Sequence, residues 1–162
     1  MSTRQVVVGL GSNLGDRAAY LAAAVARLEA NPDIVVEARS SVVATPALTQ
    51  PQPDFLNAAV RLRTTLEPEA LLDALLGIEH ALGRERRERW GARTIDLDVL
   101  WIRGETLRTP RLEVPHPGLL VRAFALYPLV EVLDPEDPGA VALRARAAEL
   151  SAPPRVGTLS EA

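Results

Sequence analysis

Apolar positions near the start of the chain change from continuous to helical spacing and back, which predicts a strand, a helix and a second strand. Gln5–Leu10 (QVVVGL) is an almost unbroken apolar run with the length of a buried strand. Arg17–Ala30 places apolar residues at helical spacing among strong helix formers, with Asp16 before it as an N-cap. Ile34–Ala44 is rich in β-branched residues and predicts a second strand, which could be bent.

Another strand, helix and strand follow. Phe55–Thr64 alternates like a strand. Glu67–Leu82 is amphipathic, with Pro68 in its first turn and Gly83 after its end, as is typical of a helix. Thr94–Ile102 is an apolar run that predicts a further strand. The order β-α-β-β-α-β is the split βαβ pattern of ferredoxin-like α+β folds, in which an antiparallel sheet carries helices on one face.

The rest of the chain is expected to connect and extend this core. Thr45–Asp54 holds three prolines in ten residues and predicts a loop, and Val114–Gly118 predicts another. Leu119–Leu133 is expected to be helical for much of its length. Residues 134–162 are expected to be a helical or irregular extension. A chain of 162 residues predicts one domain, 1–162, with its core over about 5–133.

Composition excludes several classes of protein. The net charge of −3 provides no general positive field for nucleic acid or an anionic membrane. The absence of cysteine excludes disulfides, thiol catalysis and cysteine-based zinc sites. All 18 basic residues are arginine, so the lysines of P-loops, protein kinases and Schiff-base enzymes are missing. No apolar run reaches the ~20 residues of a membrane span, and no signal-peptide region begins the chain, so a cytoplasmic protein is expected.

Asp96 and Asp98 are the first candidates for chemistry. Their i, i+2 spacing in a strand directs both carboxylates to one face, with Ile95, Leu97 and Val99 on the other. Paired carboxylates are oxygen ligands for Mg²⁺, and side chains at this spacing can serve two metal ions. The alternative is a solvent-facing side of a strand, but aspartate is a poor strand former. The pair therefore predicts a metal site.

Arginines crowd the segment directly before these aspartates. Five of the ten residues from 84 to 93 are arginine: Arg84, Arg86, Arg87, Arg89 and Arg93. Guanidinium groups bind phosphate in a bidentate manner, and Trp90 among them could cover a bound nucleotide or anchor the loop. The alternative is a solvated loop in which Glu85 and Glu88 pair with the arginines. Next to a metal site, the cluster favours phosphoryl-type transfer from a nucleotide.

Other features have plainer interpretations. The glycine turn Gly9–Gly15 resembles a dinucleotide-binding motif, but its third glycine comes one residue late, and repeated parallel βαβ units are missing. A strand-to-helix turn of small residues, which could still lie close to a substrate, is the better interpretation. Phe55 and Phe124 are expected in the core, although they could sandwich a flat heterocycle. His116 in a loop is more often structural than catalytic.

Four motifs in order resemble one known family. They are GLGSNLGDR, TP…QPDFLNAAV, IEHALGRER…RWGARTIDLDVL and VPHPGLLVRAFALYPLVEV, and together they run from about residue 5 to 133. The chain resembles the 6-hydroxymethyl-7,8-dihydropterin pyrophosphokinases of folate biosynthesis. The resemblance implies a ferredoxin-like fold and transfer of the β,γ-pyrophosphate of ATP to the pterin hydroxymethyl group, giving AMP. It implies ATP and the pterin as small-molecule partners, without nucleic acid or membrane, and a monomer is expected.

The resemblance also assigns residues. Asp96 and Asp98 are implied to hold two Mg²⁺ ions, and Arg84 and Arg93 to be catalytic. The implied pterin site consists of Thr45, Pro46, Leu48, Phe55, Asn57, Asp96 and Phe124. The implied ATP contacts are Glu79, Arg86, Trp90, Arg93, Val99, Arg111, His116 and Arg122.

This sequence departs from the family pattern at some positions. Ala47 and Ala92 stand where proline is frequent, and Phe55 where some members have tyrosine. Pro117 replaces a tyrosine and Leu76 a glutamine of some members. None of these changes touches the aspartate pair or the two catalytic-loop arginines. The intact positions argue against an inactive homologue.

A protein of another class with the same element order is a ferredoxin-like RNA-binding module. Such modules stack bases on aromatic side chains of the sheet. This chain is net acidic and only 4% aromatic. The pyrophosphokinase hypothesis is therefore favoured.

Overall fold

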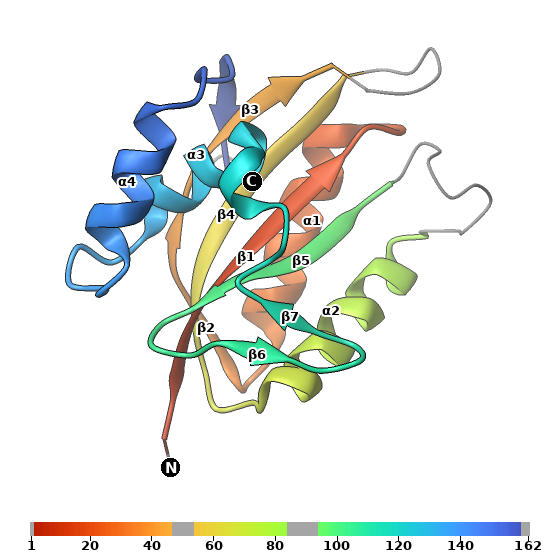
Figure 1. Ribbon diagram of the computed structural model, residues 1–162. Coiled ribbons are helices and arrows are strands. Elements are labelled where there is room, and N and C mark those ends of the chain that lie inside the picture. The colour runs from red at the N-terminus through yellow and green to blue at the C-terminus, as the bar shows by residue number, and fades with distance from the viewer. Residues whose placement is uncertain (1, 47–53, 84–93, 160–162) are drawn as a thin grey trace.

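A computed structural model of the chain describes residues 2–46, 54–83 and 94–159, and Figure 1 shows how the elements are arranged. The strands of the main sheet are β1 (Arg4–Ser12), β2 (Ile34–Arg39), β3 (Ser41–Thr45), β4 (Phe55–Thr64), β5 (Asp96–Ile102) and β8 (Arg155–Thr158). The helices are α1 (Arg17–Ala30), α2 (Pro68–Ala81), α3 (Ala123–Val132) and α4 (Ala140–Ala148), with a 3₁₀ turn, η1 (Leu119–Val121), before α3. A small hairpin is formed by β6 (Leu107–Arg108) and β7 (Glu113–Val114).

The sheet has the expected split arrangement. Its strands follow the order β5-β1-β4-β3-β8, with β2 also paired to β4, and all of these pairs are antiparallel. The antiparallel α+β prediction is confirmed. The predicted strand Ile34–Ala44 is broken at Ser40, whose hydroxyl accepts a hydrogen bond from Ala59 N–H at 2.8 Å and donates to Ser41 O at 2.7 Å. This side chain replaces ladder bonds at the point where the strand bends between β2 and β3.

Local signals placed the first two helices correctly. Asp16 caps α1 by accepting a hydrogen bond from Ala19 N–H at 3.1 Å. Pro68 begins α2, and Gly83 follows it with a φ of 84°, a left-handed conformation that suits glycine. Among the residues described here, no helix has both the length and the apolar character needed to cross a lipid bilayer.

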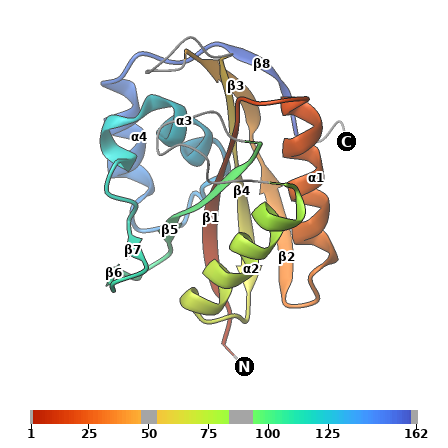
Figure 2. The same ribbon diagram turned by 90° about the vertical axis from the view of Figure 1, so that its right-hand side faces the viewer.

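Helices cover both faces of the sheet: the two helices of the βαββαβ core lie on one face, as predicted, and the helices of the later segment, whose face the sequence left open, lie on the other. Figure 2 shows α1 and α2 on one side and α3 and α4 on the other. The reason lies in strands that are apolar on both faces. Val6 and Val8 belong to the core under α1 and α2, while the intervening Val7 packs with Leu126 and Leu129 of α3. A continuous apolar run such as that in β1 is typical of a strand buried on both sides.

The C-terminal extension is more ordered than its sequence indicated. It contributes α4, which packs against α3, and β8, which pairs with β3. Asp137 joins the extension to β5, because its carboxylate accepts hydrogen bonds from Trp101 Nε1 at 2.9 Å and Gly139 N–H at 2.8 Å. Its side chain is buried, so these bonds offset the cost of removing it from water.

Gly139→Ala is expected to destabilise this junction. A Cβ atom at Gly139 would lie 2.4 Å from Cζ2 of Trp101, so the indole or α4 must move. Overpacking of this kind costs about 1–3 kcal/mol of unfolding free energy, which urea denaturation measures. Gly157→Ala is the control, because its Cβ would meet no atom within 4 Å. Equal midpoints for the two variants would contradict the prediction.

Candidate active site

Asp96 and Asp98 lie on edge strand β5 with the alternation expected from their spacing. Ile95, Leu97 and Val99 are 0%, 4% and 2% exposed in the core under α1 and α2. The aspartates are directed to the opposite face, where Asp96 is half-buried and Asp98 exposed. Within the part of the chain that the structure describes, the Asp98 carboxylate has no hydrogen bond or ion pair.

A β-bulge in β5 allows the same face of this strand to carry the two aspartates at its beginning and residues of the α3 and α4 core near its end. The pairing with β1 shifts between Val8↔Val99 and Val7↔Trp101, so Leu100 is an extra residue. Leu100 and Trp101 both join the core under α3 and α4, and Ile102 returns to the other core. The bulge leaves the alternation of residues 95–99 intact, with the two carboxylates on the face of α3.

Two glycines of β1 form the floor beside the aspartates. Gly11 lies opposite Asp96 and Gly9 opposite Asp98, and on its other side Gly11 pairs with Asn57 of β4. A Cβ on Gly11 would lie 2.7 Å from Oδ1 of Asn57, so the amide lies over the position that a side chain would fill. Adjacent strands are ~4.8 Å apart, so Asp96 and Asn57 flank Gly11 across about 10 Å.

The candidate pterin residues that the structure describes gather beside this floor. Thr45 and Phe55 face each other at the ends of β3 and β4, and Asn57 Nδ2 donates to Thr45 Oγ1 at 3.4 Å. Pro46, directly after β3, is exposed, and Phe55 is half-buried. Phe124 is half-buried in α3, which packs across β4, β3 and β1. A heterocycle stacked between the two phenylalanines stays a prediction.

Two candidate ATP residues lie beside the other side of β5. His116 N–H donates to Leu100 O at 3.0 Å, which ties the loop after β7 to β5. Its Nδ1 accepts a hydrogen bond from Gly118 N–H at 3.1 Å. The Arg122 guanidinium lies over Gly118, because a Cβ there would be 2.6 Å from Arg122 Nε. His116 is therefore held beside β5, and Arg122 lies against the same loop.

Arg111, another candidate for ATP, is paired with α2. Its Nη2 donates to Asp73 Oδ1 at 2.5 Å, and its Nη1 lies 3.7 Å from Glu69 Oε1. The hydrogen bond and charge of Asp73 raise the pKa of the Arg111 guanidinium above its ordinary value. A nucleotide that binds Arg111 must share it with these carboxylates or displace them.

Glu79, also a candidate for ATP, is directed into the protein. Its side chain is 6% exposed, and Oε2 accepts a hydrogen bond from Leu97 N–H at 2.7 Å. It therefore reaches β5 from the face of α2, between the two aspartates. The backbone of Val99, the remaining described candidate, follows on the same strand.

Some candidates lie outside the described residues. They are Leu48 of the pterin group and Arg84, Arg86, Trp90 and Arg93 of the ATP and catalytic groups, together with the unassigned Arg87 and Arg89. The flanking residues are described. The end of β3, the beginnings of β4 and β5 and the end of β1 meet at the same end of the sheet (Figure 1).

Residues of the first turn were not assigned individually from the sequence. Ser12 and Asn13 are fully buried, and the Ser12 hydroxyl has no hydrogen-bond partner within the described ranges. Arg17 Nη1 donates to Asp54 O at 2.7 Å, which joins the start of α1 to the start of β4. The GLGSNLGDR motif was the signal for this turn. That Gly11 lies between Asp96 and Asn57 follows only from the register in which β1 pairs with β4 and β5.

The donor set fits Mg²⁺. Mg²⁺ is usually held by one or two carboxylates, with substrate phosphates and waters completing the octahedron. Asp96 and Asp98 supply such a pair. Among residues 2–46, 54–83 and 94–159, no group of three or more histidines or carboxylates could enclose a metal by itself. The site suits an ion that arrives with phosphates.

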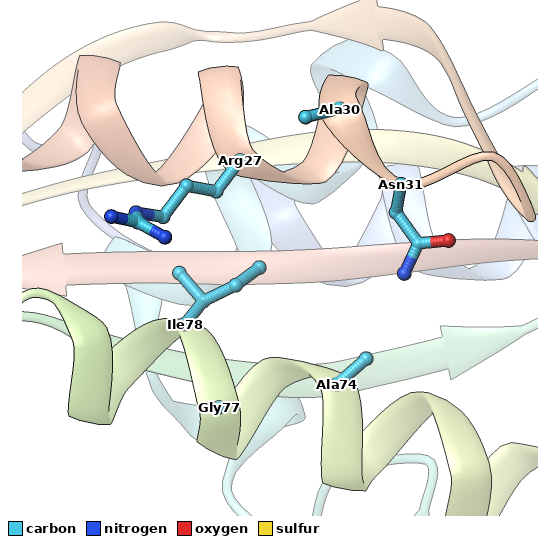
Figure 3. A pocket seen from close by; sticks show the side chains of 6 residues that line it. All are labelled: Arg27, Ala30, Asn31, Ala74, Gly77 and Ile78. Carbon is cyan, nitrogen blue, oxygen red and sulfur yellow. The ribbon is translucent and has the colours of Figure 1, made fainter.

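A pocket elsewhere contains none of the candidate residues. Figure 3 shows it between α1 and α2, on the face of the sheet opposite to the aspartates. It is lined by Arg27, Ala30, Asn31, Ala74, Gly77 and Ile78. Without a carboxylate in its lining, it offers no site for a divalent cation.

Comparison with known proteins identifies the family of the chain. A family model described as 7,8-dihydro-6-hydroxymethylpterin-pyrophosphokinase (HPPK) matches residues 7–134. The 2-amino-4-hydroxy-6-hydroxymethyldihydropteridine pyrophosphokinase of Methylorubrum extorquens is 51% identical over 77% of this chain and 80% of that protein. The protein of the same name from Bacillus subtilis is 45% identical over 77% of this chain and 75% of its own.

Solved structures show the same fold. A crystal structure of Plasmodium falciparum HPPK-DHPS with pterin and p-hydrobenzoate has a TM-score of 0.64 at 13% identity. The match covers 91% of this chain, which spans only 44% of that longer one. The family model matches most of the sequence, and the two relatives are similar to this chain along most of their own length. The chain therefore belongs to the HPPK family and is a pyrophosphokinase of folate biosynthesis.

Proposed function

We propose that the chain transfers the β,γ-pyrophosphate of ATP to the hydroxymethyl group of 6-hydroxymethyl-7,8-dihydropterin. The hydroxymethyl oxygen forms a bond to the β-phosphorus, and the bond between that phosphorus and the α,β-bridging oxygen breaks. AMP leaves with the bridging oxygen, and the hydroxyl proton is lost to solvent. The observation that carries the proposal is the row Asp96–Gly11–Asn57 across three strands, in a chain of this family.

Asp96 and Asp98 would hold two Mg²⁺ ions together with the triphosphate. The ions supply charge neutralisation for the migrating group and for the departing AMP. Asp98 supports this role because it is exposed, at the surface where a metal ion and a triphosphate could reach its carboxylate. The strand core beneath the pair fixes both backbones, so the carboxylates are preorganised and need little reorganisation during transfer.

Asn57 and Gly11 would position the pterin. The amide of Asn57 has both donors and an acceptor for the polar edge of a pterin ring. Gly11 has no side chain, so the Asn57 amide can lie over its backbone beside Asp96. A pterin whose polar edge is held by this amide would have its ring next to the carboxylates. Proximity of this kind supplies much of the rate enhancement in a transfer that needs little covalent help from the protein.

Further parts of the proposal come from the sequence. Arg84 and Arg93 would stabilise the migrating phosphates, and Arg86 and Trp90 would contact ATP. Their guanidinium and indole groups have the chemistry for phosphate binding and for covering a nucleotide. We also propose a monomer folded as a single domain, which sedimentation equilibrium and limited proteolysis would test, and a cytoplasmic location, which cell fractionation would test.

The RNA-binding alternative loses support from the architecture. Ferredoxin-like RNA-binding modules need an open sheet face on which bases stack. Here α1 and α2 cover one face and α3 and α4 pack on the other (Figure 2).

The product nucleotide tests the proposed reaction. Incubation with ATP, Mg²⁺ and the pterin is expected to yield AMP and the pterin diphosphate in equal amounts, resolved by anion-exchange chromatography. Omission of the pterin provides the control for ATP hydrolysis. Formation of ADP in place of AMP would refute pyrophosphoryl transfer and indicate single phosphoryl transfer.

A further inference from the structure

The hydrogen bond between Glu79 and Leu97 lies at an unusual place. Strand β5 is at the edge of the sheet and has β1 as its strand neighbour there. Leu97 stands between the two aspartates, and its N–H donates to Glu79 Oε2 at 2.7 Å. An unpaired N–H on an edge strand normally bonds to water. Here a side chain from α2 holds it.

The apolar surroundings of Glu79 raise the free-energy cost of burying its carboxylate. It lies on the face of α2 that carries Leu71 and Leu75, which are 1% and 0% exposed, and it reaches Leu97, which is 4% exposed. Burying a carboxylate in apolar surroundings is unfavourable unless hydrogen bonds satisfy it. An apolar residue would pack α2 against β5 without this cost. A carboxylate at this position therefore indicates a purpose beyond packing.

We propose that Glu79 is a positioning residue for the aspartate pair, an inference that rests on the proposed metal-dependent reaction. By holding the amide of the residue between Asp96 and Asp98, it fixes the local twist of β5. It thereby sets the separation and direction of the two carboxylates. The resemblance to the family implied a contact between Glu79 and the nucleotide, whereas this role acts through the strand backbone.

Two substitutions separate the hydrogen bond from the charge. Glu79→Gln keeps an oxygen that accepts from Leu97 N–H, whereas Glu79→Ala leaves that N–H without its partner. Partners that orient metal ligands typically contribute 10–100-fold to metal affinity or activity. We therefore expect Glu79→Ala to weaken Mn²⁺ binding by about tenfold or more, and Glu79→Gln to restore most of it.

Mn²⁺ binding can be measured without turnover, by electron paramagnetic resonance in the presence of a non-hydrolysable ATP analogue. Leu75→Ala is the matched control. It removes a fully buried side chain one turn away on the same face of α2. It should lower thermal stability without changing Mn²⁺ affinity. The exchange rate of the Leu97 amide, measured by NMR, should rise in Glu79→Ala and not in Glu79→Gln.

Three results would overturn the proposal. One is unchanged Mn²⁺ affinity in Glu79→Ala with a loss of stability like that of Leu75→Ala. Another is a Glu79→Gln variant as impaired as Glu79→Ala, since the hydrogen bond would then not be the cause. The third is weaker binding of the analogue without metal, which would indicate a direct nucleotide contact. By contrast, a wild-type chain that binds Mn²⁺ with the analogue but forms no AMP would refute the proposed reaction alone.

Discussion

Asp96→Asn and Asp98→Asn are each expected to lower kcat for AMP formation by on the order of 10²–10⁴-fold, with almost no loss of folding. The amide has the shape of the carboxylate but lacks the charge that holds Mg²⁺. Folding should be retained because Asp98 is exposed, Asp96 is half-buried, and the apolar face of β5 is unchanged. Turnover at saturating ATP and pterin, together with thermal unfolding midpoints, measures the two effects separately.

The control for this pair is Asp33→Asn. Asp33 is an exposed carboxylate in the turn before β2. Because β2 begins at the end of the sheet away from Asp96, the loss of one negative charge there should leave turnover unchanged. Near-normal turnover in either Asp96→Asn or Asp98→Asn would show that the metal assignment is wrong. Extra Mg²⁺ should recover part of the activity if weakened metal binding is the cause.

Gly11→Ala is expected to raise the KM for the pterin by about 10–100-fold and to change the KM for ATP little. The new Cβ would lie 2.7 Å from Asn57 Oδ1, so the amide must move. Displacement of a positioning group by about 1 Å can cost on the order of 10²-fold in rate. Initial rates with each substrate varied in turn distinguish an effect on the pterin from an effect on ATP.

Gly77→Ala provides the matched control for this substitution. Gly77 lies in α2, and a Cβ there meets no atom within 4 Å. The change should leave both KM values as they are and stabilise the helix by up to about 1 kcal/mol. A normal pterin KM in Gly11→Ala would mean that Gly11 and Asn57 do not form the pterin floor.

Predictions from short-range patterns held best. The Asp16 cap, the proline at the start of α2 and the glycine after it depend on chemistry within one helical turn. The opposite faces of Leu97 and Asp98 follow from the two-residue period of a strand. These features could be derived because each involves residues that are neighbours in the chain.

The sequence made no prediction for contacts whose partner is distant in the chain. The second helical layer required Val7 to meet α3, and β8 required pairing with β3 from more than a hundred residues away. The pairing of Arg111 with Asp73 joins a loop to a helix that comes much earlier in the chain. Short-range periodicity carries no information about such partners.

The sequence by itself determined the element order, the helix ends, the i, i+2 carboxylates and, through its four motifs, the resemblance to a pyrophosphokinase family. Only the tertiary structure decided that Gly11 lies between Asp96 and Asn57, and that Glu79 holds the amide between the two aspartates. The physical reason is register. A shift by one residue would turn every side chain of a strand to the other face, and register is set by the packing of both cores.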